Sequence, residues 1–184
     1  AQPAPFGVAV DVGTTTVVAV LVDLTTGEIV NTASALNGQV RLGDNVLTRI
    51  QVCITHPRMI GRLQHAVVAR TLQPLVEQLL RESGVAAEQI ASLVIAGNTT
   101  MLHLFAGIDP SAMGMVPFTP QFLEHRVLRL ADLPLRVRSR SAPTAKESDP
   151  PSPQATGPAA EGDPHDPPSP AVHLLPGAAA YIGA

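Results

Sequence analysis

The stretch FGVAVDVGTTTVVAVLVD, from Phe6 to Asp23, decides the fold class. In its first part, Val8, Val10 and Val12 alternate with smaller or polar residues, and residues 17–22 form a nearly continuous, β-branched apolar run; both patterns predict strands. The turn residues 23–27, in which Gly27 can take a positive φ, lead to a third predicted strand over residues 28–35. The opening of the chain is therefore predicted to be a three-stranded antiparallel meander.

Further along the chain, strands and helices are predicted to alternate. A helix is expected up to Gly84, and Pro74 inside it predicts a kink or two abutting helices, because an interior proline costs about 3 kcal/mol. A short strand over residues 92–96 leads to a second helix over residues 101–106, and a last strand is expected at residues 173–175. The order predicts an α/β domain with a mixed sheet. The residues predicted to form the apolar face of the first helix are Leu63, Val67, Leu72, Val76, Leu79 and Leu80.

Composition excludes several classes of protein. With 184 residues, 45% of them hydrophobic and 15% charged, the chain fits one ordinary soluble domain, and no stretch approaches the roughly 20 apolar residues of a membrane span. The N-terminus lacks the layout of a signal peptide, so a cytoplasmic protein is expected. The single Cys53 excludes a disulfide framework, a thiolate zinc site and a Cys-ligated iron–sulfur cluster within this chain. The formal charge of −3 gives no indication of a nucleic-acid surface.

Residues 139–170 differ from the rest of the chain. They hold nine of the 18 prolines and no Val, Leu, Ile, Met, Phe, Tyr, Trp or Cys, and the sequence Asp-Pro-Pro-Ser-Pro occurs in them twice. Such a segment cannot form a core, because burial cannot offset the entropy of ordering it. We expect a disordered, Pro-rich insert in a surface loop; a docking site for a proline-reading domain is the alternative.

The first candidate site is the turn after the first strand. Gly13 lets the backbone approach a phosphate closely, Thr14, Thr15 and Thr16 add hydroxyl donors, and Asp11 is placed to hold Mg²⁺ through water beside the phosphates. The alternative is a plain β-turn whose threonines suit strands. The turn is not a Walker A loop, because no lysine follows the glycine and Lys146, in the Pro-rich insert, is the only lysine. Phosphate charge must then be neutralised by Mg²⁺, by arginine or by a part outside this chain.

The second candidate site is the turn Gly97-Asn98-Thr99-Thr100, which leads from a strand into a helix. The N-terminus of that helix offers free N–H groups to an anion. An ordinary helix start capped by Asn98 or Thr99 is the alternative.

The other reactive residues suggest mostly structural roles. Cys53 is interpreted as a small apolar residue, His103 as a helix-surface or partly buried histidine, and the apolar stretch 113–118 as a core lid or, if exposed, a partner surface. An arginine-containing run ahead of the insert is interpreted as a solvated face, with phosphate binding as the alternative. The arginines of that run are Arg126, Arg129, Arg136, Arg138 and Arg140. No metal-ligand spacing is found among His56, His65, His103, His125, His165 and His173.

At these motifs the sequence resembles a known family. The strand, the Gly-Thr turn and residues 23–28 resemble the first phosphate loop of the acetate and sugar kinase, heat-shock chaperone and actin (ASKHA) superfamily. Residues 34–50, 97–120 and 174–183 narrow the resemblance to the C-terminal ASKHA domain of the reductive activators of corrinoid-dependent enzymes (RACE proteins). It covers nearly all of the chain outside the Pro-rich insert.

This resemblance implies an RNase H-like fold that binds ATP with Mg²⁺. It further implies ATP-dependent reduction of inactive Co(II) corrinoid, carried by the corrinoid protein of a methyltransferase system, to Co(I). In the family the electrons come from an N-terminal ferredoxin-like iron–sulfur domain, which this chain lacks. By motif position, Asp11, Gly13, Thr14, Thr15 and Thr16 would contact phosphate. The second Gly-Thr loop would be formed by Gly97, Asn98, Thr99 and Thr100.

The chain also departs from the family pattern. It reaches Ala184 where the pattern runs on to a second Asp-Gly phosphate loop, so residues 1–138 and 171–184 are predicted to be the first half of an ASKHA domain whose second half is absent. Half an active site is expected to be inactive alone, and its uncovered apolar face to favour a homodimer. The loop Gly43-Asp44-Asn45-Val46 stands where Gly-Ala-Asp-Val is expected, which puts a role for Asp44 in doubt.

Two further functions stay open. The first is a non-catalytic regulatory or partner-binding module that retains the fold, since proteins commonly keep a fold after its catalytic activity is lost. The second is a fragment of a sugar-kinase-like phosphotransferase. The phosphotransferase option stays undecided, because the sequence shows no substrate-specific motif and the second half, which usually supplies the catalytic base, is expected to be absent.

Overall fold

The computed structural model describes residues 5–136 and 170–177. Residues 139–169 of the expected Pro-rich insert and the residues after Gly177 lie outside the described residues, as do Arg138 and Arg140 of the predicted basic run. The strands are β1 Phe6–Val12, β2 Thr16–Asp23, β3 Ile29–Leu36, β4 Ile90–Gly97, β5 Arg126–Arg129 and β6 Ala171–Leu174. The α-helices are α1 Val46–Thr55, α2 Met59–Val67, α3 Gln73–Ser83 and α4 Thr99–Ala106. Shorter helical turns are η1 Gly38–Arg41, the π-helix η2 Val68–Leu72, η3 Ala87–Gln89, η4 Ser111–Gly114 and η5 Leu130–Asp132.

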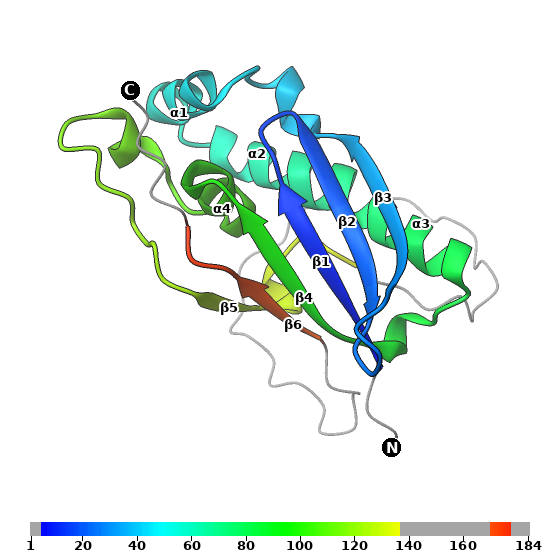
Figure 1. Ribbon diagram of the computed structural model, residues 1–184. Helices are drawn as coiled ribbons and strands as arrows, with labels where there is room; N and C mark the ends of the chain where they lie inside the picture. Colours follow the sequence, from blue (N-terminus) through cyan, green and yellow to red (C-terminus); the bar gives the residue numbers. More distant parts are fainter. Residues whose placement is uncertain (1–4, 137–169, 178–184) are drawn as a thin grey trace, which may run out of the picture.

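The strands form a mixed six-stranded sheet in the order β3-β2-β1-β4-β6-β5 (Figure 1). Strands β1, β2 and β3 are successive antiparallel neighbours, so the predicted meander is confirmed. Strands β1, β4 and β6 run parallel, and β5, which was not predicted, pairs antiparallel with β6. Because β1, β4 and β6 share a direction, the turns after them meet at one edge of the sheet.

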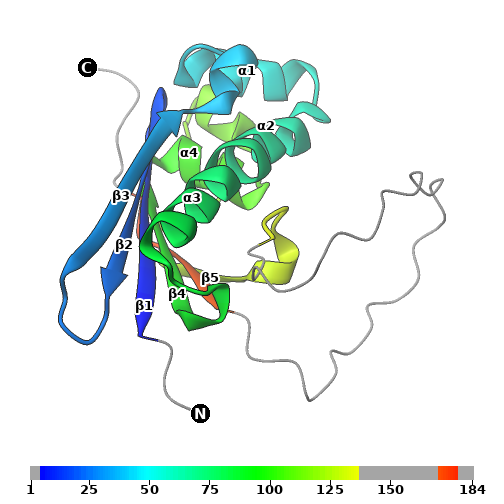
Figure 2. The ribbon, with the colours of Figure 1, turned by 90° about the vertical axis from the view of Figure 1, so that its right-hand side faces the viewer.

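All four α-helices cover one face of this sheet (Figure 2). On that side, Val8, Val10 and Val12 of β1 are buried, and all six residues predicted to form the apolar helix face are buried as well. Asp11 of β1 is exposed on the other face, because successive side chains of a strand point to opposite sides. The core therefore lies between the sheet and the helices.

Helices α2 and α3 meet at the predicted interruption. The π-helix η2 joins them, and Pro74 stands in the first turn of α3, where a missing N–H costs little. The expectation of two abutting helices is therefore confirmed. Helix α3 ends at Gly84, whose φ of 67° suits glycine. Within the described residues, no helix is both long and apolar enough to cross a membrane.

Candidate functional site

The first Gly-Thr turn joins β1 to β2 at the edge where the parallel strands end. A Cβ atom on Gly13 would lie 2.5 Å from the backbone oxygen of Thr16, so only glycine fits this turn. The side chains of Thr15 and Thr16 are exposed, and Thr14 is half-buried. The turn is therefore both tightly closed and accessible to a ligand.

Two residues hold this turn from the protein side. The Asn37 side-chain amide donates to the Gly13 carbonyl at 2.8 Å, and the Asn37 backbone N–H donates to the Thr15 carbonyl at 2.7 Å. Arg49 donates through Nη2 to the Thr14 carbonyl at 2.6 Å. Three successive carbonyls thus face the protein. In a trans peptide the N–H points opposite to the C=O, so the N–H groups of residues 14–16 point away from these partners, as an anion site requires.

Arg49 is a buried cation that has no carboxylate partner among the described residues. Its guanidinium is fully buried and also donates to the Gly43 carbonyl at 2.8 Å, to Gln39 Oε1 at 2.9 Å and to Met101 Sδ at 3.1 Å. Burial lowers the pKa of Arg49 to about 10, while the charge of Asp44 raises it. The group stays protonated at neutral pH, so a positive charge lies directly behind the turn.

Gln39 connects Arg49 to the helical layer. This buried side chain donates through Nε2 to the Leu63 carbonyl of α2 at 3.0 Å, while its oxygen accepts from Arg49. Its backbone N–H donates to Asn37 Oδ1 at 3.0 Å. The supports of the turn are thus bonded to one another and to α2, which fixes the turn before any ligand arrives.

The second Gly-Thr turn lies beside the first. Asn98 Nδ2 donates to Thr14 Oγ1 at 3.2 Å, and a Cβ on Gly97 would lie 2.9 Å from the Val12 carbonyl, so the two turns touch. Asn98 Oδ1 accepts from the N–H of Met101 at 2.9 Å, which identifies Asn98 as the cap of α4. The helix begins at Thr99, two residues before the predicted start, and Thr99 and Thr100 are buried. This turn therefore presents Asn98 and the start of α4 rather than its two hydroxyls.

Asp11 lies near the turn but on the uncovered face of the sheet. Its carboxylate makes no hydrogen bond or ion pair within the described residues, and it stands two positions before Gly13. In residues 5–136 and 170–177 no group of three or more His, Cys, Asp or Glu side chains is arranged to hold a metal ion. A Mg²⁺ ion at Asp11 would thus take its other ligands from water and phosphate.

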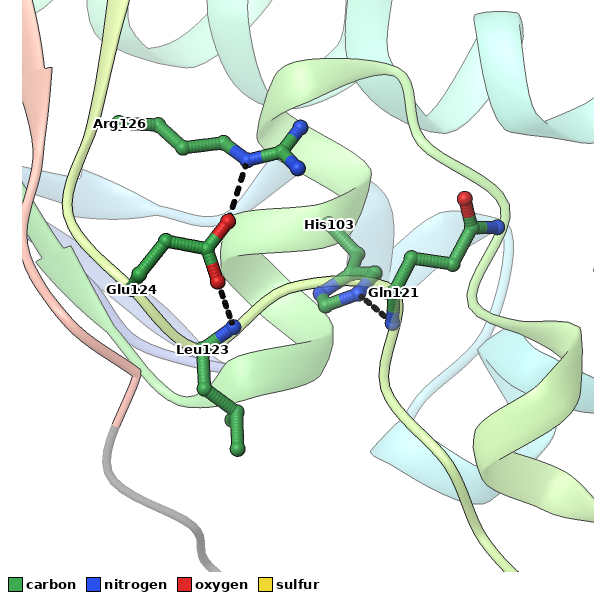
Figure 3. A network of polar contacts seen from close by, with 5 residues as sticks. All are labelled: His103, Gln121, Leu123, Glu124 and Arg126. Atoms are coloured by element: carbon green, nitrogen blue, oxygen red, sulfur yellow. Dashed lines mark hydrogen bonds and ion pairs between the residues drawn. The ribbon is translucent and has the colours of Figure 1, made fainter.

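His103 departs from the expected helix-surface or partly buried position, because it is fully buried. Its Nδ1 lies 2.7 Å from the Thr99 carbonyl, and its Nε2 accepts from the N–H of Gln121 at 3.0 Å (Figure 3). Nδ1 therefore carries the proton. The ring stacks on Phe122 with centroids 4.3 Å apart, and the Arg126 guanidinium lies 4.5 Å from the Phe122 centroid. These contacts bind residues 121–126 to α4.

A third segment, the residues after β6, lies beside the second turn, since a Cβ on Gly177 would lie 3.1 Å from Thr99 Oγ1. The N–H of Gly177, after β6, donates to the Leu123 carbonyl at 3.0 Å. In the same segment Glu124 accepts from the N–H of Leu123 at 3.1 Å and pairs with Arg126 at 3.2 Å (Figure 3). Residues after all three parallel strands are thus connected at one edge of the sheet.

The remaining candidates are structural or lie elsewhere. Cys53 is buried, which raises the pKa of its thiol to about 11 and agrees with its interpretation as an apolar residue. His125 Nε2 lies 3.1 Å from His173 Nδ1, a pairing that spacing along the chain did not reveal. In the stretch 113–118, Met113 is buried, whereas Met115, Val116 and Phe118 are exposed.

Asn37, Gln39 and Arg49 were not predicted as site residues from the sequence. One signal for Arg49 was present, because it falls between Val46, Ile50 and Cys53 on the apolar face of α1. An arginine on such a face needs buried acceptors, and the nearby turns supply them. Nothing local marked Asn37 or Gln39, whose partners are distant in sequence.

Comparison with known proteins agrees with this architecture. The family model described as the RACo middle region matches residues 6–144. The chain belongs to this family. The corrinoid activation enzyme RamQ of Eubacterium limosum is 32% identical over 139 residues, which are 76% of this chain and 23% of RamQ. A solved structure, described as a reductive activator for corrinoid,iron-sulfur protein, aligns with a TM-score of 0.77 and 32% identity, over 100% of this chain and 24% of that one.

The resemblance to corrinoid reductive activators is thereby confirmed, as is the ASKHA-type α/β fold. The chain spans about a quarter of the length of these relatives. This partial coverage agrees with the prediction that it corresponds to one part of such an activator.

Proposed function

We propose that this chain is the ATP-binding half-domain of a reductive activator that returns Co(II) corrinoid, on the corrinoid protein of a methyltransferase system, to Co(I). The single observation that carries the ATP part is the first Gly-Thr turn, with its carbonyls held inward by Asn37 and Arg49 and its N–H groups left for an anion. The corrinoid part is supported by relatives described as a corrinoid activation enzyme and a reductive activator.

The residues at this edge suit the phosphates of a nucleotide. The turn would donate from backbone N–H groups and from the hydroxyls of Thr15 and Thr16, and the Arg49 charge behind it favours an anion without touching it. Asp11 would hold Mg²⁺ through water. When bound, Mg-ATP would supply the free energy that drives closure of the protein and makes the cobalt reduction accessible. Each Co(II) takes up one electron, which an iron–sulfur protein or domain outside this chain would deliver.

The nucleotide part is tested by titrating the 184-residue chain with Mg-ATP in a calorimeter. The Thr14→Ala/Thr15→Ala variant is expected to bind about tenfold more weakly or worse, because it loses one hydroxyl donor and the Asn98–Thr14 contact that joins the turns. Thr32→Ala is the matched control, since Thr32 is an exposed threonine of β3. Equal affinity of the three proteins, or absence of ATP binding, would contradict the ATP proposal.

The corrinoid part needs a separate measurement. We expect saturable binding of the chain to a purified Co(II) corrinoid protein by the same method, with a non-corrinoid protein of similar charge as the control. If the chain binds the non-corrinoid protein with equal affinity, the partner proposal is contradicted and the nucleotide proposal is unaffected.

A partner-binding module without nucleotide dependence is the second candidate. The exposed apolar residues Met115, Val116 and Phe118 favour it, because they form an apolar segment at the surface. It predicts that Thr14→Ala/Thr15→Ala leaves binding of the corrinoid protein unchanged whether or not ATP is present.

A further inference from the structure

An arginine-rich cavity lies beside the edge that carries the Gly-Thr turns. It has a volume of about 700 Å³ and opens between η1, α2 and the π-helix η2. Four arginines line it, Arg41, Arg58, Arg62 and Arg70, together with His65, and no Asp or Glu is among its lining residues. These arginines come from η1, from the turn before α2, from α2 and from η2, so separate elements bring residues of one charge to the same cavity.

This positive charge is not balanced within the described structure. Residues 36–76 contain five arginines and a single acidic residue, Asp44, although the whole chain has a formal charge of −3. The ion pairs among the described residues join Arg126 to Glu124 and Arg129 to Asp132, and none reaches the cavity. Like charges that face one cavity repel, and a bound anion would remove that cost.

The walls of the cavity are fixed by buried polar contacts. Thr71 of η2 donates through Oγ1 to the Ala66 carbonyl at 2.8 Å and accepts from the N–H of Gly38 at 3.0 Å. This hydroxyl therefore binds η1 to the junction of α2 and η2. Such π-helical turns are rare and occur frequently at functional sites.

We propose that this cavity binds a small polyanion, a molecule that carries two or more phosphate or carboxylate groups. Its volume lies within the range of roughly 300–1,000 Å³ that is usual for small-molecule sites. Guanidinium groups match phosphate and carboxylate in pairs of parallel hydrogen bonds, and several of them suit a ligand with several anionic groups. Leu36, Leu42 and Ala66 supply an apolar wall for the rest of such a molecule.

The cavity is separate from the proposed nucleotide edge but adjoins it. Asn37 lines the cavity and also donates to the Gly13 carbonyl of the first turn. A polyanion bound here would therefore lie next to the residue that fixes that turn.

The proposal is tested by calorimetric titration of the 184-residue chain with tripolyphosphate and, in a second arm, with citrate, both at physiological ionic strength. The Arg62→Gln/Arg70→Gln variant is expected to lose about tenfold or more in affinity for the probe that binds. Both residues are exposed, so the fold should tolerate the change. Arg81→Gln, an exposed arginine of α3, is the matched control and should keep the affinity of the unaltered chain. Thr14→Ala/Thr15→Ala, which alters the first turn instead, shows whether that turn holds the probe.

Four outcomes would overturn the proposal. In the first, neither probe binds. In the second, the Arg62→Gln/Arg70→Gln variant binds the probe as tightly as the unaltered chain does. In the third, Thr14→Ala/Thr15→Ala loses binding instead, which would place the anion at the first turn. A polyglutamate peptide is included as a further probe. If it alone binds, and does so through Arg62 and Arg70, the cavity is a contact for an acidic protein surface and the small-molecule proposal fails. Preference for tripolyphosphate over citrate, or the reverse, assigns the anionic group.

Discussion

The two Gly-Thr turns lie side by side but are stabilised in different ways. The turn at residues 97–100 is fixed by its own Asn98, whose side chain accepts from an N–H three residues later. The turn at residues 13–16 is fixed by Asn37 and Arg49, which are 24 and 35 residues away from the atoms they bind. One turn is a local structure, and the other exists only once the helical layer has packed.

This difference bears on function. A locally capped turn keeps its shape wherever its helix forms, whereas the shape of the first turn depends on the buried chain from Arg49 through Gln39 to α2. A change in the helical layer can therefore reach the first turn through this chain of contacts. The cavity lined by Asn37 lies at the point where such a change would enter.

The largest expected effect comes from Arg49→Met, which keeps an apolar stem in the core but removes the donors. Three buried acceptors would lose their partner: the carbonyls of Thr14 and Gly43 and the side-chain oxygen of Gln39. Each unsatisfied acceptor lowers the stability of the fold by about 1–3 kcal/mol. The free energy of unfolding, measured by urea denaturation, should fall by about 3 kcal/mol or more. Arg81→Met on the exposed face of α3 is the control and should change it by less than about 0.5 kcal/mol.

A fall of less than about 1 kcal/mol in Arg49→Met would remove the distinction between the turns. It would mean that water takes the place of the guanidinium, so that the first turn does not depend on the helical layer.

A smaller effect is expected from Asn98→Ala. Loss of a helix cap costs about 1 kcal/mol, and the contact with Thr14 Oγ1 is lost as well. Asn98→Ser separates the two roles, because serine caps a helix but is too short to reach Thr14. If the second turn is held locally, urea denaturation should show that Asn98→Ser recovers most of the stability. Equal losses in both variants would show that the contact with the first turn matters more than the cap.

The same contrast explains what could be predicted from the sequence. Alternation in β1, the helical spacing of Leu63 and Val67, and a cap at Asn98 or Thr99 are local signals. The first two were confirmed, and of the two possible caps the structure has Asn98. Strand β5 has only four residues, half of them arginine, and it forms because β6 lies beside it. The buried position of His103 likewise follows from packing against Phe122. No local sequence pattern predicts that contact.

The smallest expected effect is a pH dependence of stability that arises from His103. This residue joins α4, which follows the second turn, to residues 121–126. Burial lowers the pKa of His103 below its ordinary value of 6.5, the bond to the Thr99 carbonyl opposes this, and the charge of Arg126 adds to the lowering. Below that ordinary value the unfolded chain binds this proton more readily than the folded chain does. The contribution of His103 to stability is thus present at neutral pH and is lost as the pH falls below about 6.5.

His103→Phe keeps an aromatic ring against Phe122 but cannot titrate. The free energy of unfolding of the unaltered chain, measured by urea denaturation at about pH 7.5 and again at about pH 5.5, should fall more than that of the variant. His65→Phe, which changes an exposed histidine of α2, is the control. Its free energy of unfolding should fall between the two pH values by as much as that of the unaltered chain. If the unaltered chain and His103→Phe lose stability in parallel, His103 does not couple α4 to residues 121–126 through its protonation state. The segment would then be held by the stack of Arg126 on Phe122 and by the bond from Gly177 to Leu123.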